Sequence, residues 1–338
     1  MDLRYPARVV FGWQERYCLS EVVDGISTAT GARKAHLLLV TTRTFGASPL
    51  EDVKTLCGVS PCSHFTGIPP EPSLNVVEDL RERISDCAAE IVVAVGGGSV
   101  IDAAKAAAIL GNKPGTVADY FQGERTIDAP GLPLVALPTT AGTGAEITKN
   151  AVLTDTSTQN KKSLRSPWMV PHAAIVDPEL TLTLPAQQTA ASGLDALTQA
   201  VESFISERAN EVSRPLAAEA TSLLMNNLMD AYRNGQDRGA RTEVAKGSML
   251  TALAFSQSGL GAVHGLAHPI GALLGLEHGV VCAVLLPHIL RWNASACENE
   301  LGALAHYLHM GDACEFVDAV VRLVEDMDMP RGLASAGL

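Results

Sequence analysis

The sequence lacks the long hydrophobic runs that would place it in a membrane. None of its apolar stretches reaches the roughly 18 consecutive residues that a transmembrane helix needs. Asp2 and Arg4 stand close to its first residue, and no apolar segment typical of a secretory signal follows them. We therefore expect a cytoplasmic protein without membrane contact.

Positive charge is also scarce. Lys and Arg number 25 against 37 Asp and Glu, so the formal net charge is −12 at pH 7. A surface of this kind is not typical of nucleic-acid binding, and we expect no nucleic-acid partner. The seven cysteines are scattered and odd in number, which indicates reduced thiols, as in a cytoplasmic protein, rather than a disulfide framework.

The chain of 338 residues exceeds the size that one hydrophobic core usually supports, so two domains are expected. Before residues 184 and 185, short apolar runs alternate with helical stretches, which is typical of a parallel sheet. After them, successive segments follow the helical period, which predicts a bundle. We therefore predict an α/β dinucleotide-binding domain over residues 1–184 and an all-α helical-bundle domain over residues 185–338.

The predicted elements follow from this periodicity. In the first domain we expect a first hairpin from Ala7 to Trp13, strands at 36–40, 91–95, 134–137 and 173–177, and helices around 74–88 and 100–110. In the second domain we expect helices at 190–206, 213–233, 240–256, 261–274, 280–292, 300–309 and 313–327. The sequence contains no internal repeat and no low-complexity tract.

A glycine-rich turn follows the predicted strand at 91–95. Between a buried strand and the start of a helix, such a turn presents backbone N–H groups to a phosphate. It is not the G-x-G-x-x-G dinucleotide fingerprint, and close packing of strand and helix is the alternative explanation. The turn consists of Gly96, Gly97, Gly98 and Ser99.

A second polar loop follows the predicted strand at 134–137. Open α/β sheets bind ligands at the carboxyl ends of their strands, which is where this loop lies. An ordinary polar loop is the alternative, because Thr and Gly form such loops readily. Its hydroxyls and flexible positions are Thr139, Thr140, Gly142, Thr143 and Gly144.

Three histidines stand in an apolar, almost uncharged segment. His264 and His268 are four residues apart and therefore share one face of a helix. His278 follows just past Gly275, where a turn is expected. Single buried histidines are common in protein cores, but three so close together favour a metal or catalytic centre.

The best candidate for a carboxylate ligand is Asp195. It lies in a predicted helix with a polar stripe formed by Asp195, Gln199 and Glu202. One Asp and two His suit Zn²⁺ or Fe²⁺ and leave a position open for a substrate oxygen. The alternative is an acid near a helix N-terminus, stabilised by the helix dipole.

Five motifs carry a resemblance to a known family over essentially the whole chain. They are, in order, GGGSVIDAAK, PTTAGTGAEIT, VDPELT, GLDALTQAVE and GAVHGLAHPIG followed by EHGVVCAVLLPH. The sequence resembles the iron-containing (group III) alcohol dehydrogenases, relatives of glycerol dehydrogenase and dehydroquinate synthase. This resemblance implies a dehydroquinate synthase-like fold, NAD or NADP as cofactor, and a divalent metal, Fe²⁺ or Zn²⁺, between the two domains.

The resemblance also implies roles for individual residues. The cofactor pyrophosphate is expected at the glycine turn with Asp102 nearby, the phosphates and nicotinamide at Thr139, Thr140 and Thr143, and the nicotinamide ribose at Lys161. The metal ligands carry over to Asp195, His264 and His278. His268 matches a histidine beside the substrate and is the candidate for proton relay.

Two positions depart from the family pattern. A histidine usually follows the ligand Asp by four residues, whereas this chain has Gln199, and an amide oxygen is a poor ligand beside imidazole. The site is then expected to hold metal through three residues, to hold it weakly, or to work without it. After the first strand, Thr42 and Arg43 replace the Asp typical of NAD-preferring members, so NADH and NADPH both remain open.

The expected reaction is reversible NAD(P)H-dependent reduction of a small aldehyde or ketone to an alcohol. The opening RYPARVVFG also resembles maleylacetate reductases, which reduce a keto diacid without metal, but those tend to have Asn at the position of Asp195. A dehydroquinate synthase-like cyclase is a further alternative, although residues 240–290 offer few basic side chains for a phosphorylated substrate. Because this family commonly oligomerises, a homo-oligomer such as a dimer is expected.

Overall fold

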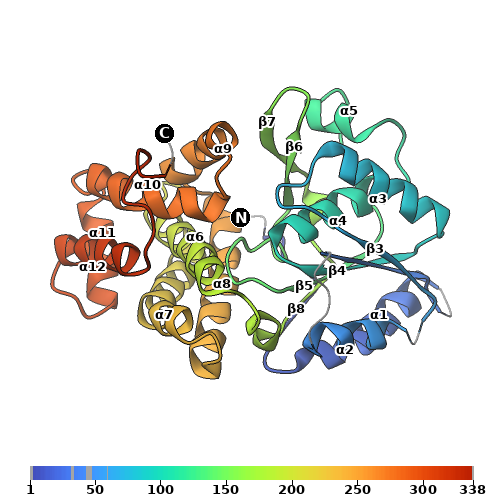
Figure 1. Ribbon diagram of the computed structural model, residues 1–338, viewed down its shortest axis with the longest axis horizontal. Coiled ribbons are helices and arrows are strands. Elements are labelled where there is room, and N and C mark those ends of the chain that lie inside the picture. The colour runs from blue at the N-terminus through green and yellow to red at the C-terminus, as the bar shows by residue number, and fades with distance from the viewer. Residues whose placement is uncertain (1–2, 32–33, 43–47, 59, 337–338) are drawn as a thin grey trace. The chain divides into compact units, whose positions relative to one another are not determined.

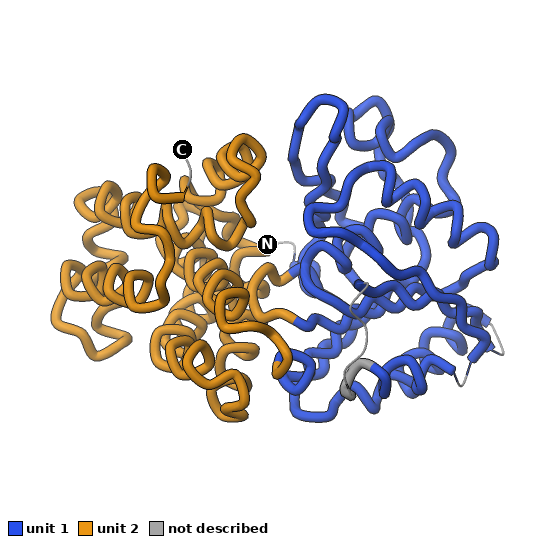
Figure 2. The backbone as a smooth tube through the Cα atoms, in the orientation of Figure 1, with its two compact units in different colours: residues 1–139, 145–181 blue, residues 140–144, 182–338 orange. Residues whose placement is uncertain are grey.

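The computed structural model describes residues 3–31, 34–42, 48–58 and 60–336. Two compact units divide the chain, one of residues 1–139 and 145–181 and the other of residues 140–144 and 182–338 (Figure 2). The boundary expected from the sequence lay at residues 184 and 185. The short segment 140–144 was expected in the first domain, but it packs with the second unit.

A parallel sheet organises the first unit (Figure 1). In the described residues it has six strands in the order β1-β8-β5-β4-β2-β3, and every neighbouring pair is parallel. The strands are β1 (Arg8–Phe11), β2 (Leu37–Thr41), β3 (Cys62–Thr66), β4 (Ile91–Gly96), β5 (Leu134–Pro138) and β8 (Ala173–Val176). The helices are α1 (Leu19–Thr30), α2 (Ser48–Cys57), α3 (Leu74–Asp86), α4 (Gly98–Leu110) and α5 (Val117–Gln122), with short 3-10 helices η1 (Glu15–Cys18), η2 (Pro167–Met169) and η3 (Pro178–Thr181).

Hydrophobic cores cover both faces of this sheet. In β4, Val92 and Ala94 pack with residues of α3 and α4, whereas Ile91 and Val93 pack on the opposite face with residues of α1 and α2. A parallel strand buried on both sides needs apolar residues at every position. The sequence has such apolar runs at 36–40, 91–95, 134–137 and 173–177, and the structure confirms a strand at each of them.

The predicted hairpin from Ala7 to Trp13 is wrong. Arg8–Phe11 forms one strand, β1, which pairs in parallel with β8, far along the chain. An antiparallel pair does occur elsewhere in the first unit, between β6 (Asn150–Asp155) and β7 (Asn160–Arg165). This pair could not be predicted from the sequence because β7 is largely polar and half-exposed and gives no apolar run.

The second unit is helical in its described part. Its helices are α6 (Ala186–Ile205), α7 (Ser213–Arg233), α8 (Arg238–Ser258), α9 (Ala262–Leu274), α10 (His278–Asn293), α11 (Glu298–Tyr307) and α12 (Ala313–Asp326). All seven helices predicted beyond residue 185 are confirmed, with ends that shift by no more than about four residues, as helix boundaries commonly do. The predicted fold class, a parallel α/β part followed by an all-α part, is confirmed.

No single helix among the described residues has both the length and the apolar character to cross a membrane. Helices α10 and α11 meet these two criteria only when taken together, and the chain bends by 118° between them.

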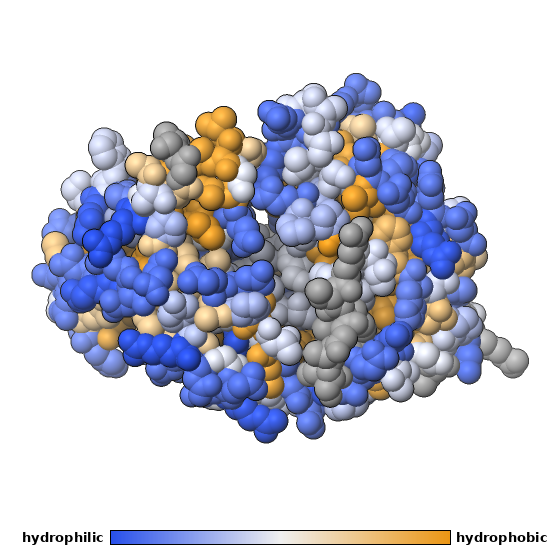
Figure 3. All heavy atoms as spheres, viewed as in Figure 1, coloured by the Kyte–Doolittle hydropathy of each residue, from blue (hydrophilic) through white to orange (hydrophobic). Residues whose placement is uncertain are grey.

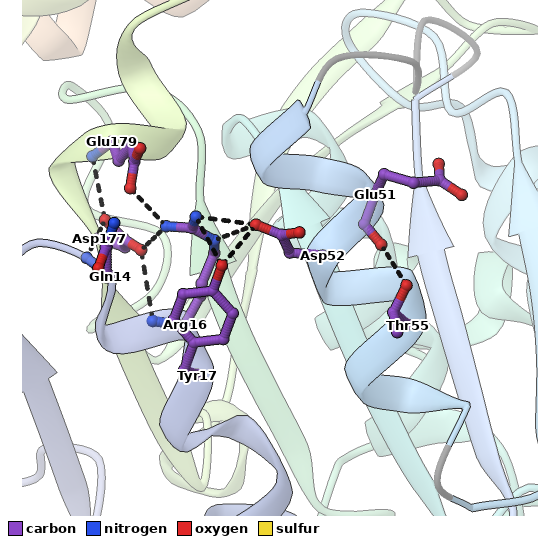
Figure 4. A network of polar contacts seen from close by, with 8 residues as sticks. All are labelled: Gln14, Arg16, Tyr17, Glu51, Asp52, Thr55, Asp177 and Glu179. Atoms are coloured by element: carbon purple, nitrogen blue, oxygen red, sulfur yellow. Dashed lines mark hydrogen bonds and ion pairs between the residues drawn. The ribbon is translucent and has the colours of Figure 1, made fainter.

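An ionic network ties together the ends of β1 and β8 in the first unit (Figure 4). The guanidinium of Arg16 is 3% exposed and donates to Asp177 at 2.7 Å, Glu179 at 2.8 Å and Asp52 at 2.9 Å. Asp177 is fully buried and also accepts hydrogen bonds from the backbone N–H groups of Gln14, at 3.1 Å, and Glu179, at 3.0 Å. A buried carboxylate is tolerated here because it is paired and hydrogen-bonded.

Glu146 gives the first unit a predicted dependence on pH. It is buried, and this burial raises its pKa to about 7 although its own backbone N–H and Lys105 favour the charged form. The ordinary pKa of this group is 4.5, so the folded protein retains a proton that the unfolded chain releases. The contribution of protonated Glu146 to the stability of the folded state is therefore complete below pH 4.5 and is lost as the pH rises through 7.

The variant Glu146→Gln should lack this pH dependence. Relative to the variant, the native protein is expected to lose up to roughly 3 kcal/mol of unfolding free energy as the pH rises from mildly acidic to mildly alkaline values. Denaturant unfolding over a pH series measures this difference, with the exposed Glu124→Gln as control. A pH-independent difference between native protein and Glu146→Gln would contradict it.

Candidate active site

Asp195 lies in the middle of α6 and is 1% exposed. It is therefore not an acid at the helix N-terminus, which was the alternative reading of its position. Burial opposes the charged form, but the neighbouring His278 and His264 outweigh it and hold the pKa of Asp195 below its usual range. A buried carboxylate of this kind requires a cationic partner.

Two imidazoles from α9 and α10 converge on Asp195. The Nε2 atoms of His264 and His278 lie 3.2 Å and 3.7 Å from its Oδ1. On the other side of the His264 ring, Nδ1 lies 2.6 Å from Glu202 Oε2. Because Glu202 also accepts a hydrogen bond from the backbone of Val263, at 2.7 Å, it holds the ring with Nε2 toward Asp195, as outer carboxylates do for metal-bound histidines.

Two glycines bring His278 to this position. Helix α9 ends at Gly275, whose φ of 65° lies in the left-handed region that glycine adopts at low cost. Helix α10 begins three residues later, and Gly279 lies so close to α6 that an added Cβ would be 2.4 Å from the backbone oxygen of Ala191. A larger residue at 279 would push His278 away from Asp195.

The structure adds a residue to this cluster that the sequence analysis missed. Cys282 lies one helical turn after His278, and its Sγ is 3.6 Å from His278 Nε2 and 3.9 Å from His264 Nε2. The donor atoms of Asp195, His264, His278 and Cys282 all lie within 4.8 Å of one another. The spacing of four residues between His278 and Cys282 in a helical segment was the available signal.

His268 and Gln199 border the cluster in different ways. The ring of His268 is half-buried and stacks on that of His278, with centroids 4.9 Å apart and planes 14° from parallel. Gln199 follows Asp195 by one turn of α6 and is 3% exposed. Its Oε1 accepts no hydrogen bond from the described residues, although a buried amide oxygen normally has a partner.

This set of residues fits a divalent metal ion. A carboxylate oxygen, two imidazole nitrogens and a sulfur are donors that Zn²⁺ accepts and that Fe²⁺ accepts in part. The donors are buried and close together, and the unsatisfied Gln199 Oε1 lies on the same face of α6 as Asp195. Without a cation the Cys282 thiol stays protonated, because burial and the neighbouring Asp195 raise its pKa to about 12.

The glycine turn lies in the first unit, between β4 and α4. At Gly96 an added Cβ would lie 2.6 Å from the Val100 side chain, so close packing explains this glycine. Gly97 is the N-cap of α4 and offers no side chain to cap it. The first N–H groups of α4, at Gly98 and Ser99, therefore form the kind of helix start that binds phosphate.

Other predicted cofactor residues gather near this turn. The backbone N–H of Thr139 donates to Gly96 O at 3.0 Å. Ser99 Oγ accepts a hydrogen bond from the backbone of Glu71 at 3.2 Å, and the Glu71 carboxylate forms an ion pair with Lys161. Glu71 thus links Ser99 to Lys161, a connection that the sequence analysis did not predict.

Asp102 is placed differently from the other predicted cofactor residues. Its Oδ2 accepts a hydrogen bond from the backbone of Val152, at 2.9 Å, and its carboxylate lies 3.5 Å from the Lys105 ammonium. Burial raises the pKa of Asp102 although Lys105 favours its charged form. The hydrogen bond from Val152 attaches α4 to β6, so in the described residues Asp102 acts as a structural link.

The remaining predicted residues lie in loops. Thr42 directly follows β2 and is half-buried, and Arg43 lies outside the described residues. Thr140 is half-buried and Thr143 exposed, in the segment that belongs to the second unit. There, added Cβ atoms at Gly142 and Gly144 would lie 2.8 Å from Ser192 and 2.4 Å from Ala252, which shows how tightly the segment packs on α6 and α8.

The protein combines a parallel α/β unit that carries a glycine turn with a helical unit that carries a buried carboxylate–histidine cluster. This combination defines a class of metal-dependent dinucleotide enzymes. The family profile described as Iron-containing alcohol dehydrogenase matches residues 6–178, and the profile of the family's C-terminal part, Fe-containing alcohol dehydrogenase family, C-terminal, matches residues 189–338. The chain belongs to the iron-containing alcohol dehydrogenase family.

Individual relatives agree with this assignment. Long-chain-alcohol dehydrogenase 1 of Geobacillus thermodenitrificans is 38% identical over 81% of this chain and 71% of its own length. The 1,3-propanediol dehydrogenase of Citrobacter freundii is 39% identical over 81% of this chain and 73% of its own length. A solved 1,3-propanediol oxidoreductase superposes with a TM-score of 0.93 and 32% identity, covering 100% of this chain and 89% of its own.

The assignment confirms what the resemblance implied about class and chemistry. The protein is an oxidoreductase that acts on CH–OH groups, in a family that uses NAD(H) and a divalent metal ion. A sulfoacetaldehyde reductase from Bifidobacterium kashiwanohense, solved in complex with NAD⁺, is 30% identical, with a TM-score of 0.91, and covers 100% of this chain and 88% of its own.

Proposed function

We propose that this protein reduces a small aldehyde or ketone to an alcohol, reversibly, at a divalent ion held by Asp195, His264 and His278. The observation that carries the proposal is the convergence of these three side chains on one point, with Asp195 1% exposed. Relatives named for 1,3-propanediol, lactaldehyde and 4-hydroxybutyrate support a short substrate. One relative is named for long-chain alcohols, so the assays should include substrates of increasing carbon-chain length.

The residues of this chain divide the chemical work among them. When bound, reduced nicotinamide supplies hydride, and the divalent ion polarises the carbonyl oxygen. Asp195 contributes the negative charge that retains the ion, and Glu202 orients the His264 ring. His268, half-buried and stacked on His278, donates a proton to the substrate oxygen during reduction and accepts it during oxidation.

We assign the cofactor pyrophosphate to the start of α4, where backbone N–H groups and the positive end of the helix favour an anion. Thr42 is followed by no carboxylate that would repel a 2′-phosphate, so both NADH and NADPH should be accepted. Asp102 supports this turn by holding α4 against β6. The direct contacts are assigned to Gly97, Gly98, Ser99, Thr139, Thr140, Thr143 and Lys161, whereas Gly96 allows the close packing of β4 on Val100.

One set of assays tests the function. The purified protein is stripped of metal, reloaded with Fe²⁺ or Zn²⁺, and assayed with NADH and NADPH against short aldehydes, ketones and maleylacetate. We expect turnover of aldehydes or ketones that a chelator abolishes and added metal restores. Chelator-resistant turnover of maleylacetate alone would replace the proposal with the metal-independent reductase.

We also propose that the enzyme works in the cytoplasm as a homo-oligomer. Hydrophobic side chains lie at the surface over α9 (Figure 3), where Leu266 and Leu273 are exposed. In α10, Trp292 is 83% exposed. We assign the contact between copies to this apolar surface. Sedimentation velocity tests it, and a monomer at micromolar concentration would count against it.

A further inference from the structure

The geometry points to Cys282 as a fourth metal donor, which makes this a zinc-type centre rather than an iron-type one. Cys282 is fully buried on α10, on the same helix face as His278. The inference rests on the metal centre proposed above and adds a donor to it. It also changes the preferred ion, and the carbonyl oxygen of the substrate then binds as a fifth donor, in the five-coordinate arrangement to which catalytic zinc sites can expand.

The distances in the cluster resemble the edges of one coordination tetrahedron. Bonds of about 2.1 Å to nitrogen and oxygen and about 2.3 Å to sulfur require N···O edges of about 3.4 Å and S···N edges of about 3.6 Å. The observed N···O edges from His264 and His278 to Asp195 are 3.2 and 3.7 Å. The S···N edges from Cys282 to the same two rings are 3.6 and 3.9 Å.

All four of these edges lie within about 0.3 Å of the values for a tetrahedral ion. The remaining pairs of donor atoms are no farther apart than 4.8 Å, which is up to about 1.4 Å longer than a tetrahedral edge, so these pairs must draw together when an ion binds. A cysteine that merely filled space in the core would not need its sulfur beside two imidazole nitrogens. These contacts also suit a thiol hydrogen-bonded to the imidazoles, so the tests below separate a hydrogen-bonded thiol from a metal-bound thiolate.

The chemistry of the fourth donor decides which ion is preferred. When Cys282 binds, its S–H bond breaks, a sulfur–metal bond forms and the proton passes to solvent. A thiolate is a soft ligand that Zn²⁺ accepts readily, and Zn²⁺ also binds such mixed sites more tightly than Fe²⁺. We expect the isolated enzyme to contain Zn²⁺ in preference to Fe²⁺.

Gln199 is the rival fourth donor. Its Oε1 is buried, accepts no hydrogen bond from the described residues and lies one turn along α6 from Asp195. An amide oxygen is, however, a weaker ligand than a thiolate for Zn²⁺ beside imidazole. Gln199 and Cys282 make opposite predictions for the spectrum of a bound transition metal, so the two assignments can be separated directly.

The first test is spectroscopic and independent of catalysis. The full-length protein is stripped and reloaded with Co²⁺, which is expected to give a sulfur-to-cobalt charge-transfer band in the near ultraviolet. Cys282→Ser should lose this band. Gln199→Ala should keep it, and so should the matched control Cys297→Ser, which alters a half-buried cysteine elsewhere in the second unit. Co²⁺ bound without a sulfur band, or a band that survives in folded Cys282→Ser, would overturn the assignment.

The second test needs no variant at all. X-ray absorption of the Zn²⁺-loaded native protein should show one sulfur at about 2.3 Å among lighter donors. This measurement decides the question even if Cys282→Ser fails to fold. A coordination shell of nitrogen and oxygen alone would overturn the assignment.

Competition with a chromophoric chelator gives the size of the effect. Cys282→Ser should lower the affinity for Zn²⁺ by more than roughly 100-fold, which exceeds the loss expected when a residue that only supports a ligand is replaced. The affinity for Fe²⁺ should fall by a smaller factor. The ratio of Zn²⁺ to Fe²⁺ affinity should therefore fall, and an unchanged ratio would contradict the proposal.

The outcomes also separate this inference from the proposed function. A sulfur–cobalt band in a protein that turns over no carbonyl compound would refute the function and leave Cys282 as a ligand. Metal-dependent turnover with a sulfur-free coordination shell would support the function and refute Cys282 as a ligand.

Discussion

Replacing Asp195 with Ala is expected to lower kcat/KM by about 10³-fold or more, because a metal ion contributes several kcal/mol of transition-state stabilisation. Asp195 supplies the carboxylate on which His264 and His278 converge, at 3.2 and 3.7 Å. Without it the ion loses its carboxylate donor and is held more weakly. Steady-state kinetics, together with the metal content of the purified variant, measure the effect.

Two further variants calibrate this loss. Glu202→Gln leaves the proposed ligands in place and alters only the partner of His264, so it should reduce metal affinity by roughly 10- to 100-fold. Asp230→Ala removes an exposed carboxylate from α7 and should leave both activity and metal content unchanged. Asp195→Ala that retains its metal and most of its activity would refute the role given to this cluster.

Replacing Arg16 with Ala is expected to destabilise the first unit by about 3 kcal/mol or more. The change leaves Asp177 fully buried without its guanidinium partner, although backbone N–H groups of Gln14 and Glu179 still donate to it. Breaking a buried ion pair costs more than the pair contributes, because the remaining charge stays desolvated. Urea denaturation followed by circular dichroism measures the loss as a shift of the transition midpoint.

The matched control is Arg8→Ala. Arg8 also forms an ion pair at 2.8 Å, with Glu21, but these side chains are 44% and 70% exposed. Solvent screens such a pair, so its removal should leave the midpoint nearly unchanged. In a second test, Asp177→Asn introduced beside Arg16→Ala should recover part of the lost stability. Equal effects of Arg16→Ala and Arg8→Ala would contradict the argument from burial.

Much of the fold could be predicted from local sequence. The strand at 91–95 and the helices of the second unit carry their own periodicity, because burial on two faces or on one stripe requires apolar residues at regular positions. The parallel pairing of Arg8–Phe11 with Ala173–Val176 could not be predicted from any local pattern, because it joins segments that lie far apart in the sequence. The same holds for the segment 140–144, whose membership in the second unit depends on its close approach to α6 and α8.

The candidate metal centre was predictable only in part. The three histidines and Asp195 stood out because burying a polar group costs free energy unless it is paired or binds a metal ion. Cys282 did not stand out, because a cysteine in an apolar helix resembles any small core residue. Glu202 shared the polar stripe of Asp195, but nothing in the stripe revealed that it would meet the His264 ring.

The amino-acid sequence by itself determined the buried strands at 36–40, 91–95, 134–137 and 173–177, the helices of the second unit, the glycine turn before α4 and the family to which the chain is similar. Periodicity, backbone freedom and side-chain chemistry are local properties, so they are present before folding. The tertiary structure alone decided which donors share one point. Helices α6, α9 and α10 bring Asp195, His264 and Cys282 together across dozens of residues, because Gly275 and Gly279 let α10 pack against α6.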